Sequence, residues 1–550
     1  MNTNKSRKDI WTVATFVCLL LFFLFLVYPV FQIFRQSVID SDGAFTVRYF
    51  LKFFSKPYYL NALFNSLKVS LCATVLSVIL GTALAFLIHS VKIRGKGVVE
   101  ILIIITMLSP PFIGAYSWIL LLGRSGVITT FIRNVFGIQI PAIYGFPGML
   151  VVFTTQMYSL VFLYVSGALK NLDRSMLEAS ECFGCTGLRR VLKVVIPLIG
   201  PTMLSAGLLV FMRSMADFGT PQLIGEGYRT MPYLIYNEFI SEVGGNSGFA
   251  AALSVLMVLL TTILFLGQKM AARRFSYSMS AVNPIEPQPL RGWRSVLAHV
   301  VIYVPVFIGL LPQLTVTYTA FQNTNGVRFV DGYSLKSFAS AMDKLSSSVR
   351  NTLAFSLIAV LIIVVLGTLI AYLSVRRHNM AVSILDSLTM MPYIIPGSVM
   401  GIALLMGFSS KPIKLMGTAA IIILAYVLRR MPYTIRSASA ILMNIHPSVE
   451  EASMSLGASK LKTFIKITAP MMRGGVVSGA ILSWMTIISE LSASVLLYVT
   501  RTQTMTISIY TEVIRGNYGV AAAMSVMLTV VTILVLMLFF KVSGKREMSL

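Results

Sequence analysis

Long apolar runs recur along the whole chain, and each is long enough to cross a lipid bilayer. A helix of about 20 apolar residues spans the roughly 30 Å of hydrocarbon in a membrane. The chain has 550 residues, of which 56% are hydrophobic and only 12% are charged, whereas soluble domains carry about 25% charged residues. The pattern predicts an all-α integral membrane protein.

Twelve transmembrane helices are predicted, six in each half of the chain. The first follows a short basic tail, is too long for a signal peptide and lacks a small-residue cleavage site, so we expect it to be retained. The predicted spans are Ile10–Phe34, Ala62–His89, Val98–Leu122, Phe146–Val165, Thr202–Met215, Gly248–Gln268, Trp293–Phe321, Thr352–Val375, Ile384–Phe408, Met416–Leu428, Val476–Glu490 and Val520–Lys541.

The chain is strongly basic, with a formal net charge of +25. In a soluble protein this charge would suggest a nucleic-acid partner. In a membrane protein, Lys and Arg instead hold cytoplasmic loops on the inner side. With the N-terminus inside, the larger basic clusters fall in cytoplasmic segments. We therefore expect contact with membrane lipid and none with nucleic acid, and both termini in the cytoplasm.

The two halves of the chain repeat each other. Asn65-Ser66-Leu67 leads to a glycine-containing stretch at Gly81, and Asn351-Thr352-Leu353 leads to a similar stretch at Gly367 at the same spacing. Six spans per copy is an even number, so both copies enter the membrane from the same side as a parallel repeat. The predicted domains are residues 1–280 and 293–550, joined by a Pro-rich linker at 281–292.

A charged motif occurs once in each half, with the same internal spacing. The first copy has a Glu-Ala-Ser triplet followed by a Gly and then a Pro, and the second copy repeats the three features at identical offsets. The residues are Glu178, Ala179, Ser180, Gly184 and Pro197 in the first copy, and Glu451, Ala452, Ser453, Gly457 and Pro470 in the second.

Each copy of this motif predicts a short helix on the face of the membrane. Asn171 or Asp173 is placed to cap the first helix, Gly184 interrupts it, and Pro197 begins or kinks the next membrane helix. Small outward-facing side chains on such a helix suit insertion into a groove of a partner protein.

The motif resembles the coupling loop of binding-protein-dependent ABC importer permeases, and the resemblance covers nearly the whole chain, twice. It implies a type I importer transmembrane domain in a bacterial inner membrane. It also implies that Glu178–Gly187 and Glu451–Lys460 form helices that dock into two copies of an ABC ATPase, while an extracytoplasmic binding protein delivers the substrate. The chain has no phosphate-binding G-x-x-x-x-G-K-[ST] motif, so ATP and Mg²⁺ are expected on the partner ATPase, with no cofactor and no catalytic residue here.

The finer resemblance is to the fused two-half permeases of ferric iron type, carried by Asp217-Phe218-Gly219-Thr220-Pro221 and Ser489-Glu490-Leu491-Ser492-Ala493. It implies ferric iron as the substrate. Thiamine, polyamine and aminoethylphosphonate are the alternatives within the same importer class. A secondary transporter driven by an ion gradient is the alternative outside it, and it would not need twin Glu-Ala-Ser loops.

Two acidic residues lie at matched positions near the end of each fifth span. Asp217 and Glu490 are substrate-pathway candidates, because ionisable residues within a membrane are functional candidates by default and carboxylates attract hard cations. The alternative is that each ends its helix at the water interface. Arg213 is placed to pair with Asp217. Arg429 and Arg430 are expected to reach the cytoplasm by snorkelling, with a place along a cavity as the alternative. The four histidines are scattered, and no metal site is predicted.

Overall fold

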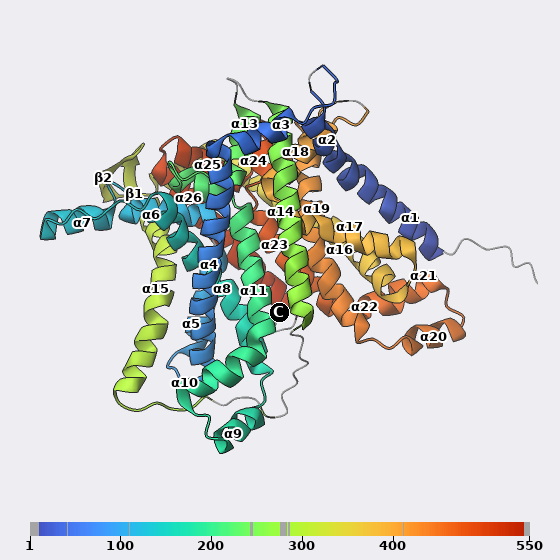
Figure 1. Ribbon diagram of the computed structural model, residues 1–550, viewed down its shortest axis with the longest axis horizontal. Coiled ribbons are helices and arrows are strands. Elements are labelled where there is room, and N and C mark those ends of the chain that lie inside the picture. Colours follow the sequence, from blue (N-terminus) through green and yellow to red (C-terminus); the bar gives the residue numbers. More distant parts are fainter. Residues whose placement is uncertain are drawn as a thin grey trace, which may run out of the picture.

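The computed structural model describes residues 10–40, 42–108, 110–241, 246–274, 283, 287–410 and 412–543. Within these ranges the chain is mostly helical, and most of the long helices run from one side of the molecule to the other (Figure 1). The apolar runs therefore form helices, as the sequence predicts.

The first half contains fourteen α-helices and two π-helical segments in its described residues. They are α1 (Ile10–Phe22), η1 (Phe23–Val27), α2 (Tyr28–Val38), α3 (Arg48–Ser55), α4 (Pro57–Ser90), α5 (Lys96–Leu108), α6 (Pro111–Leu122), α7 (Val127–Phe136), α8 (Gly145–Lys170), α9 (Arg174–Cys182), α10 (Gly187–Arg190), η2 (Val191–Val195), α11 (Ile196–Ala216), α12 (Gly219–Ile224), α13 (Met231–Ile240) and α14 (Ser247–Arg274).

The second half repeats this order and adds a β-hairpin after its first helix. Its elements are α15 (Trp293–Phe321), β1 (Gln322–Asn325), β2 (Arg328–Tyr333), α16 (Lys336–Arg376), α17 (Met380–Ile394), α18 (Gly397–Phe408), α19 (Ala419–Met443), α20 (Ser448–Ser455), α21 (Lys460–Thr463), η3 (Phe464–Thr468), α22 (Ala469–Met471), α23 (Arg473–Ile488), α24 (Ser494–Leu497), η4 (Thr500–Thr502), α25 (Met505–Ile514) and α26 (Tyr518–Ser543). The strands β1 and β2 pair antiparallel.

The number of spans differs in detail from the twelve predicted. Across the described ranges, nine helices are long and apolar enough to cross a membrane, and two bent helix pairs raise the number to eleven. The predicted span Val98–Leu122 is divided into α5 and α6, because Pro110 and Pro111 lack the N–H groups that a continuous helix needs. The predicted span Met416–Leu428 overlaps the first part of the longer helix α19, which continues to Met443 and carries Arg429, Arg430 and Arg436.

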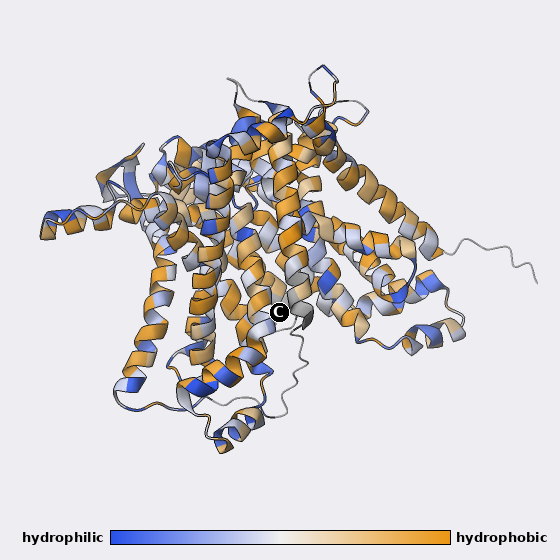
Figure 2. Cartoon of the chain, viewed as in Figure 1, coloured by the Kyte–Doolittle hydropathy of each residue, from blue (hydrophilic) through white to orange (hydrophobic). Residues whose placement is uncertain are grey.

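Hydropathy is arranged as expected for a protein in a bilayer. Figure 2 shows hydrophobic residues along the long helices and hydrophilic residues gathered in the loops and at the lower end, around α9, α10 and α20. Many large apolar side chains on the long helices are exposed, among them Phe64, Leu71, Ile79, Leu357 and Val365. Lipid tails cover such side chains without the cost that water would impose.

The repeat that the sequence predicts is present in three dimensions. Helices α6 and α18 begin 286 residues apart, and α10 and α21 begin 273 residues apart. The difference of 13 residues coincides with α7, an insertion in the first half that projects to the left in Figure 1.

The two halves interlock through their first helices. Helices α1 and α2 pack against α17 and α18 of the second half, while α15 packs against α5 and α6 of the first half. Trp11 of α1 lies 4.7 Å from the ring of Tyr372 and 5.3 Å from the ring of Phe464, measured between ring centroids. Each half therefore supplies a helix to the outer surface of the other.

The predicted linker at 281–292 is only partly described, because residues 281, 282 and 284–286 lie outside the described residues. Gln288 donates a backbone hydrogen bond to Ser90 at 3.0 Å and accepts one from Lys92 at 2.9 Å. The linker thus lies against the end of α4. The division into domains at 1–280 and 293–550 stays a prediction.

Candidate functional site

The first copy of the repeated motif lies on α9. Asp173 caps this helix by accepting a hydrogen bond from the backbone N–H of Ser175 at 2.9 Å, as predicted. The helix ends before Gly184, whose φ of 73° is a left-handed conformation that glycine adopts without strain. The expected bounds Glu178–Gly187 are wrong at both ends, since the helix starts at Arg174 and stops at Cys182.

The second copy lies on α20 and has the same form. Gly457 has a φ of 88° and follows the helix as Gly184 follows α9. The expected bounds Glu451–Lys460 are again shifted, because α20 covers Ser448–Ser455 and the chain turns at Gly457. Both glycines satisfy the left-handed turn that commonly ends a helix.

Both motif helices project from the lower side of the molecule, apart from one another (Figure 1). Glu178, Ala179, Glu451 and Ala452 are exposed, whereas Ser180 is half-buried. Ser453 is buried and shares a hydrogen bond of 2.9 Å with the hydroxyl of Thr463. The outward face of each helix is therefore free to meet another protein.

A bulky apolar residue stands out at the same place in both motifs. Phe183 and Leu456 are each 90% exposed, and they lie directly before the turning glycine. Burial of such a side chain against a partner protein removes apolar surface from water and is favourable. The sequence analysis missed this pair; its signal was an apolar residue at the same offset in both copies.

The chain leaves each motif by the same unusual route. A five-residue π-helical segment, Val191–Val195 in the first half and Phe464–Thr468 in the second, connects the motif to its membrane helix. Pro197 and Pro470 follow at the start of the regular α-helix. Such π segments are rare and occur often at functional sites.

The two motif helices are not held equally. Glu450 of α20 forms an ion pair with Arg376 of α16 at 2.8 Å and accepts a hydrogen bond from Tyr372 at 3.0 Å. The matching residue in α9 is Leu177, and none of the described residues of α9 is buried. Helix α20 is thus fixed to the membrane helices by a buried charge pair that α9 lacks.

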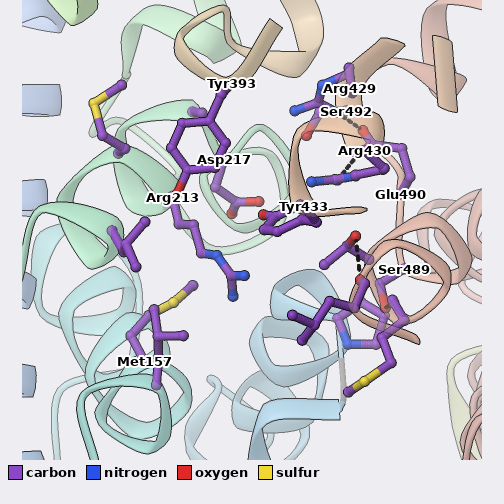
Figure 3. Close-up of a pocket in the computed structure, with 18 of the residues that line it drawn as sticks. Met157, Arg213, Asp217, Tyr393, Arg429, Arg430, Tyr433, Ser489, Glu490 and Ser492 are labelled. Atoms are coloured by element: carbon purple, nitrogen blue, oxygen red, sulfur yellow. Dashed lines mark hydrogen bonds and ion pairs between the residues drawn. The ribbon is translucent and has the colours of Figure 1, made fainter. Parts of the chain in front are cut away.

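A cavity of about 270 Å³ lies between the halves. Figure 3 shows Arg213 and Asp217 on one side of it and Arg429, Arg430 and Glu490 on the other. The two acidic residues predicted for a substrate pathway therefore line one cavity. Their role in transport stays a prediction.

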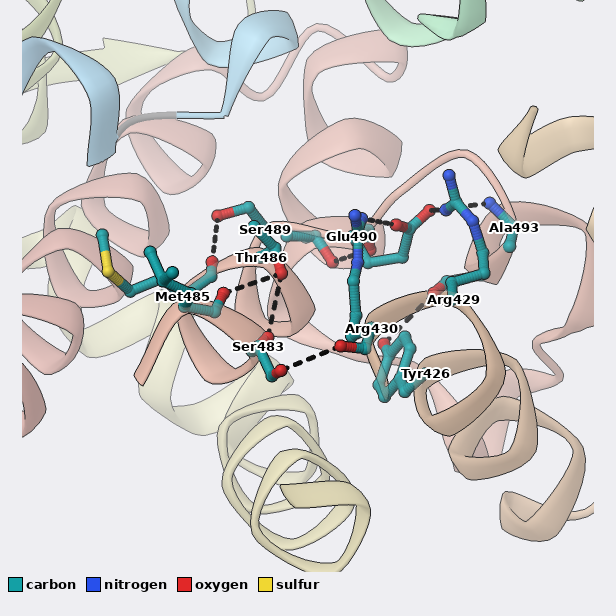
Figure 4. Close-up of polar contacts among 12 residues, drawn as sticks. Tyr426, Arg429, Arg430, Ser483, Met485, Thr486, Ser489, Glu490 and Ala493 are labelled. Carbon is teal, nitrogen blue, oxygen red and sulfur yellow. Dashed lines mark hydrogen bonds and ion pairs between the residues drawn. The ribbon is translucent and has the colours of Figure 1, made fainter. Parts of the chain in front are cut away.

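Glu490 is held by two arginines. It is 4% exposed and forms ion pairs with Arg429 and Arg430, and it accepts a hydrogen bond from the backbone N–H of Ala493 at 3.1 Å (Figure 4). Ser483 donates to the backbone carbonyl of Arg430 at 2.9 Å. The expectation that the two arginines snorkel to the cytoplasm is wrong, because both side chains point to this buried carboxylate.

Asp217 has a different environment. It accepts a hydrogen bond from the backbone N–H of Thr220, in the first turn of the short helix α12, at 3.0 Å. Glu490 likewise accepts a hydrogen bond from the backbone N–H of the residue three positions later, Ala493. Arg213 lies beside Tyr393 and Tyr433, and among the ion pairs of the described chain none includes Arg213. The expected pairing of Arg213 with Asp217 is therefore not present.

The cavity is asymmetric, because matched positions carry different side chains. The repeat places Gln156 and Met157 of α8 where α19 has Arg429 and Arg430. Tyr164, Tyr393 and Tyr433 also line the cavity, and the sequence analysis missed them. An alignment of the two half-sequences would have shown that Arg429 and Arg430 have no arginine counterparts in the first half. It would not have shown that their side chains point into the cavity.

The two halves also meet directly beside this cavity. Phe218 lies 6.0 Å from the ring of Tyr510, and a side chain at Gly219 would come within 3.1 Å of Leu491. In the part of the chain that the structure describes, no group of three or more His, Cys, Asp or Glu residues has the arrangement to hold a metal ion.

The family described as the binding-protein-dependent transport system inner membrane component matches this chain twice, over residues 73–277 and 363–547. The chain belongs to this family. It is thus a multi-pass membrane permease whose fold occurs twice in one polypeptide, and each matched segment contains one complete copy of the Glu-Ala-Ser motif.

Two similar proteins cover most of this permease, and a third covers about half of it. The ferric transport system permease protein FbpB of Actinobacillus pleuropneumoniae is 28% identical over 96% of this chain and 77% of its own length. The putative ferric transport system permease protein FbpB 1 of Haemophilus influenzae is 27% identical over 89% of this chain and 78% of its own. A putative 2-aminoethylphosphonate transport system permease protein, PhnU of Salmonella choleraesuis, is 23% identical over 49% of this chain and 93% of its own.

Proposed function

We propose that this permease is the membrane subunit of an ATP-driven importer, with ferric iron as its substrate. Two copies of a separate ABC ATPase bind the cytoplasmic side, one at α9 and one at α20, and they hold the ATP and Mg²⁺. An extracytoplasmic binding protein delivers the substrate to the opposite side. The permease itself catalyses no reaction and carries no cofactor.

The observation that carries this proposal is the pair of matched motif helices. Each presents an exposed Glu-Ala pair and a nearly fully exposed apolar residue, Phe183 or Leu456, to the surroundings. A short helix with an apolar tip suits a groove on a partner. Two such helices, one per half, fit two identical ATPase subunits.

Coupling follows from the connection between these helices and the cavity. The chain continues from α9 through the π segment into α11, which ends beside Asp217, and from α20 into α23, which ends beside Glu490. Closure of the ATPases on ATP moves the motif helices together. The attached membrane helices then tilt and shift the population between the inward-open and outward-open states.

Substrate identity is supported by the two similar permeases whose names specify ferric transport. The second candidate is 2-aminoethylphosphonate, supported by the permease whose name specifies it. Location in the bacterial inner membrane is part of the proposal, with both termini in the cytoplasm. In support, the Ile10 end of α1 lies on the side of α20 and α21 (Figure 1).

The test is ATP hydrolysis by the permease reconstituted in liposomes with the ATPase encoded beside it. Binding proteins loaded with ferric iron or with 2-aminoethylphosphonate are added in turn. Stimulation by the ferric-loaded protein alone is the expected result. Stimulation by the phosphonate-loaded protein alone would replace iron by the second candidate, and failure to associate with any ATPase would reject the importer.

A further inference from the structure

The central cavity carries more positive than negative charge. Its lining includes the three guanidinium groups of Arg213, Arg429 and Arg430, against the two carboxylates of Asp217 and Glu490. The repeat supplies no matching arginine for any of the three, since Gln156, Met157 and Thr486 occupy the corresponding positions. The excess charge is therefore a feature of this cavity and not a by-product of the duplication.

The two carboxylates are already occupied by the protein. Glu490 forms ion pairs with both Arg429 and Arg430, and Asp217 accepts a hydrogen bond from the backbone N–H of Thr220 in α12. Arg213 has no carboxylate partner within the described ranges. In addition, the buried Nε atoms of Arg429 and Arg430 have no hydrogen-bond acceptor in the protein, and a buried donor without an acceptor is costly.

These groups match an oxyanion better than a bare metal ion. Guanidinium groups bind phosphate and carboxylate oxygens through paired N–H donors, and the hydroxyls of Tyr393 and Tyr433 beside Arg213 are further donors. An uncoordinated trivalent cation would meet a surplus of positive charge at short range. The cavity volume of about 270 Å³ accommodates a small ion with a few ligands.

We infer that the cavity binds an anionic oxygen ligand, with Arg213 as its main contact. Resting on the proposed function, this means that ferric iron crosses the membrane as a complex with a small oxyanion, such as phosphate or carbonate, and not as the free ion. The arginines then hold the anion while the anion holds the iron. The two oxyanions share this chemistry, so the experiment distinguishes them.

Dual-label uptake tests the inference directly. Proteoliposomes contain the full permease, its ATPase and unlabelled ATP, and receive binding protein loaded with ⁵⁵Fe and either ³²P-phosphate or ¹⁴C-carbonate. We expect one of the two anions to accumulate with iron at about one anion per iron. Arg213→Gln should lower uptake of both labels more than tenfold, and Arg213→Lys should restore part of it by keeping the charge.

The matched control is Arg436→Gln. Arg436 lies on the long helix α19, outside the cavity, and pairs with Asp386 at an exposed site. It should leave uptake unchanged. Iron uptake without either labelled anion would overturn the inference and leave the ferric importer intact. Uptake of labelled 2-aminoethylphosphonate in place of iron, with the same dependence on Arg213, would retain the anion site and reject iron. Uptake of neither iron nor 2-aminoethylphosphonate would reject both the anion site and the proposed importer function.

Discussion

At the scale of single residues, the cluster around Glu490 is the most demanding feature of the permease. One carboxylate that is 4% exposed forms ion pairs with two guanidinium groups whose side chains are 12% and 17% exposed. Charges taken out of water require partners with good geometry. Glu490 therefore links α19, which carries both arginines, to the segment that directly follows α23.

Replacing Glu490 by Gln should destabilise the protein strongly. The change leaves Arg429 and Arg430 buried side by side without a counter-charge, which costs roughly 3–5 kcal/mol in the free energy of unfolding. The measurement is the apparent Tm of the purified permease in detergent. Asp386→Asn is the matched control, because its pair with Arg436 is exposed and such pairs contribute about 0–1 kcal/mol. Equal losses of Tm in the two variants would contradict this account.

The sequence predicts which acidic residues matter better than it predicts their partners. Asp217 and Glu490 were found from the repeat alone, since an acidic residue recurs at the same offset from each motif. Arg429 and Arg430 were assigned to the wrong environment. Which side of α19 faces the other half depends on packing between segments far apart in the chain, and a local pattern does not contain that information.

At the scale of elements, close helix contacts depend on glycine at matched positions. A Cβ at Gly81 of α4 would lie 2.6 Å from the backbone oxygen of Tyr158 of α8. At the matched Gly367 of α16, the nearest atom would be the Thr434 Cγ2 of α19 at 3.2 Å. A side chain added at Gly81 would therefore meet backbone, which does not move easily. A side chain added at Gly367 would meet the Thr434 side chain, which is able to shift.

Gly81→Ala and Gly367→Ala should therefore differ in effect. Overpacking at Gly81 should cost roughly 1–3 kcal/mol and lower the apparent Tm. At Gly367 the strain is smaller and is offset by the better helix propensity of Ala, about 1 kcal/mol, so the Tm should hardly change. An equal or larger loss at Gly367 would show that the two helix pairs are packed differently from this description.

The unequal attachment of the motif helices has a consequence for coupling. Glu450→Gln removes the negative charge that pairs with Arg376 of α16. Helix α20 should then move independently of α16. ATP hydrolysis should persist, while substrate uptake per ATP should fall several-fold. Lys96→Gln is the control, because its pair with Glu100 is long and partly exposed. The ratio of uptake to hydrolysis measures the effect, and an unchanged ratio in Glu450→Gln would refute the role of this pair.

The sequence predicted that these elements exist but not where they end. It placed Asp173 as a cap and Gly184 as an interruption, because side-chain caps and glycine turns are local features. It missed the π segments at Val191–Val195 and Phe464–Thr468, since a π turn has no sequence pattern that separates it from an α-helix. The insertion α7 was also missed, because its run of apolar residues is too short to suggest a transmembrane span.

At the scale of the whole molecule, the exchange of first helices makes the two halves one body. Helix α2 approaches α18 so closely that a Cβ at Gly407 would lie 3.0 Å from the Cα of Pro29. Contacts of this kind, more than the linker, join the halves. Segment exchange was beyond the sequence analysis, because six spans per half describe a separate bundle and an interlocked one equally well.

The permease should therefore assemble from two separate chains. Residues 1–280 and 281–550, co-expressed with a tag on the first, should co-purify in detergent. Gly407→Leu in the second chain should reduce the recovery several-fold by blocking the approach of α2. Gly474→Leu, where a side chain meets open space, should not. Failure of the unmodified halves to associate would mean that the linker, and not the helix exchange, holds them together.

The central claim is that α9 and α20 transmit the work of two ATPases to the cavity between the halves. Its most direct test is co-purification of the ATPase with the double variant Glu178→Arg, Glu451→Arg. The control variant, Glu226→Arg with Asp331→Arg, makes the same change of charge away from the motif helices. We predict loss of the ATPase from the first variant only, with both variants monodisperse and unchanged in helical content. Normal recovery of the ATPase with the first variant would contradict the claim.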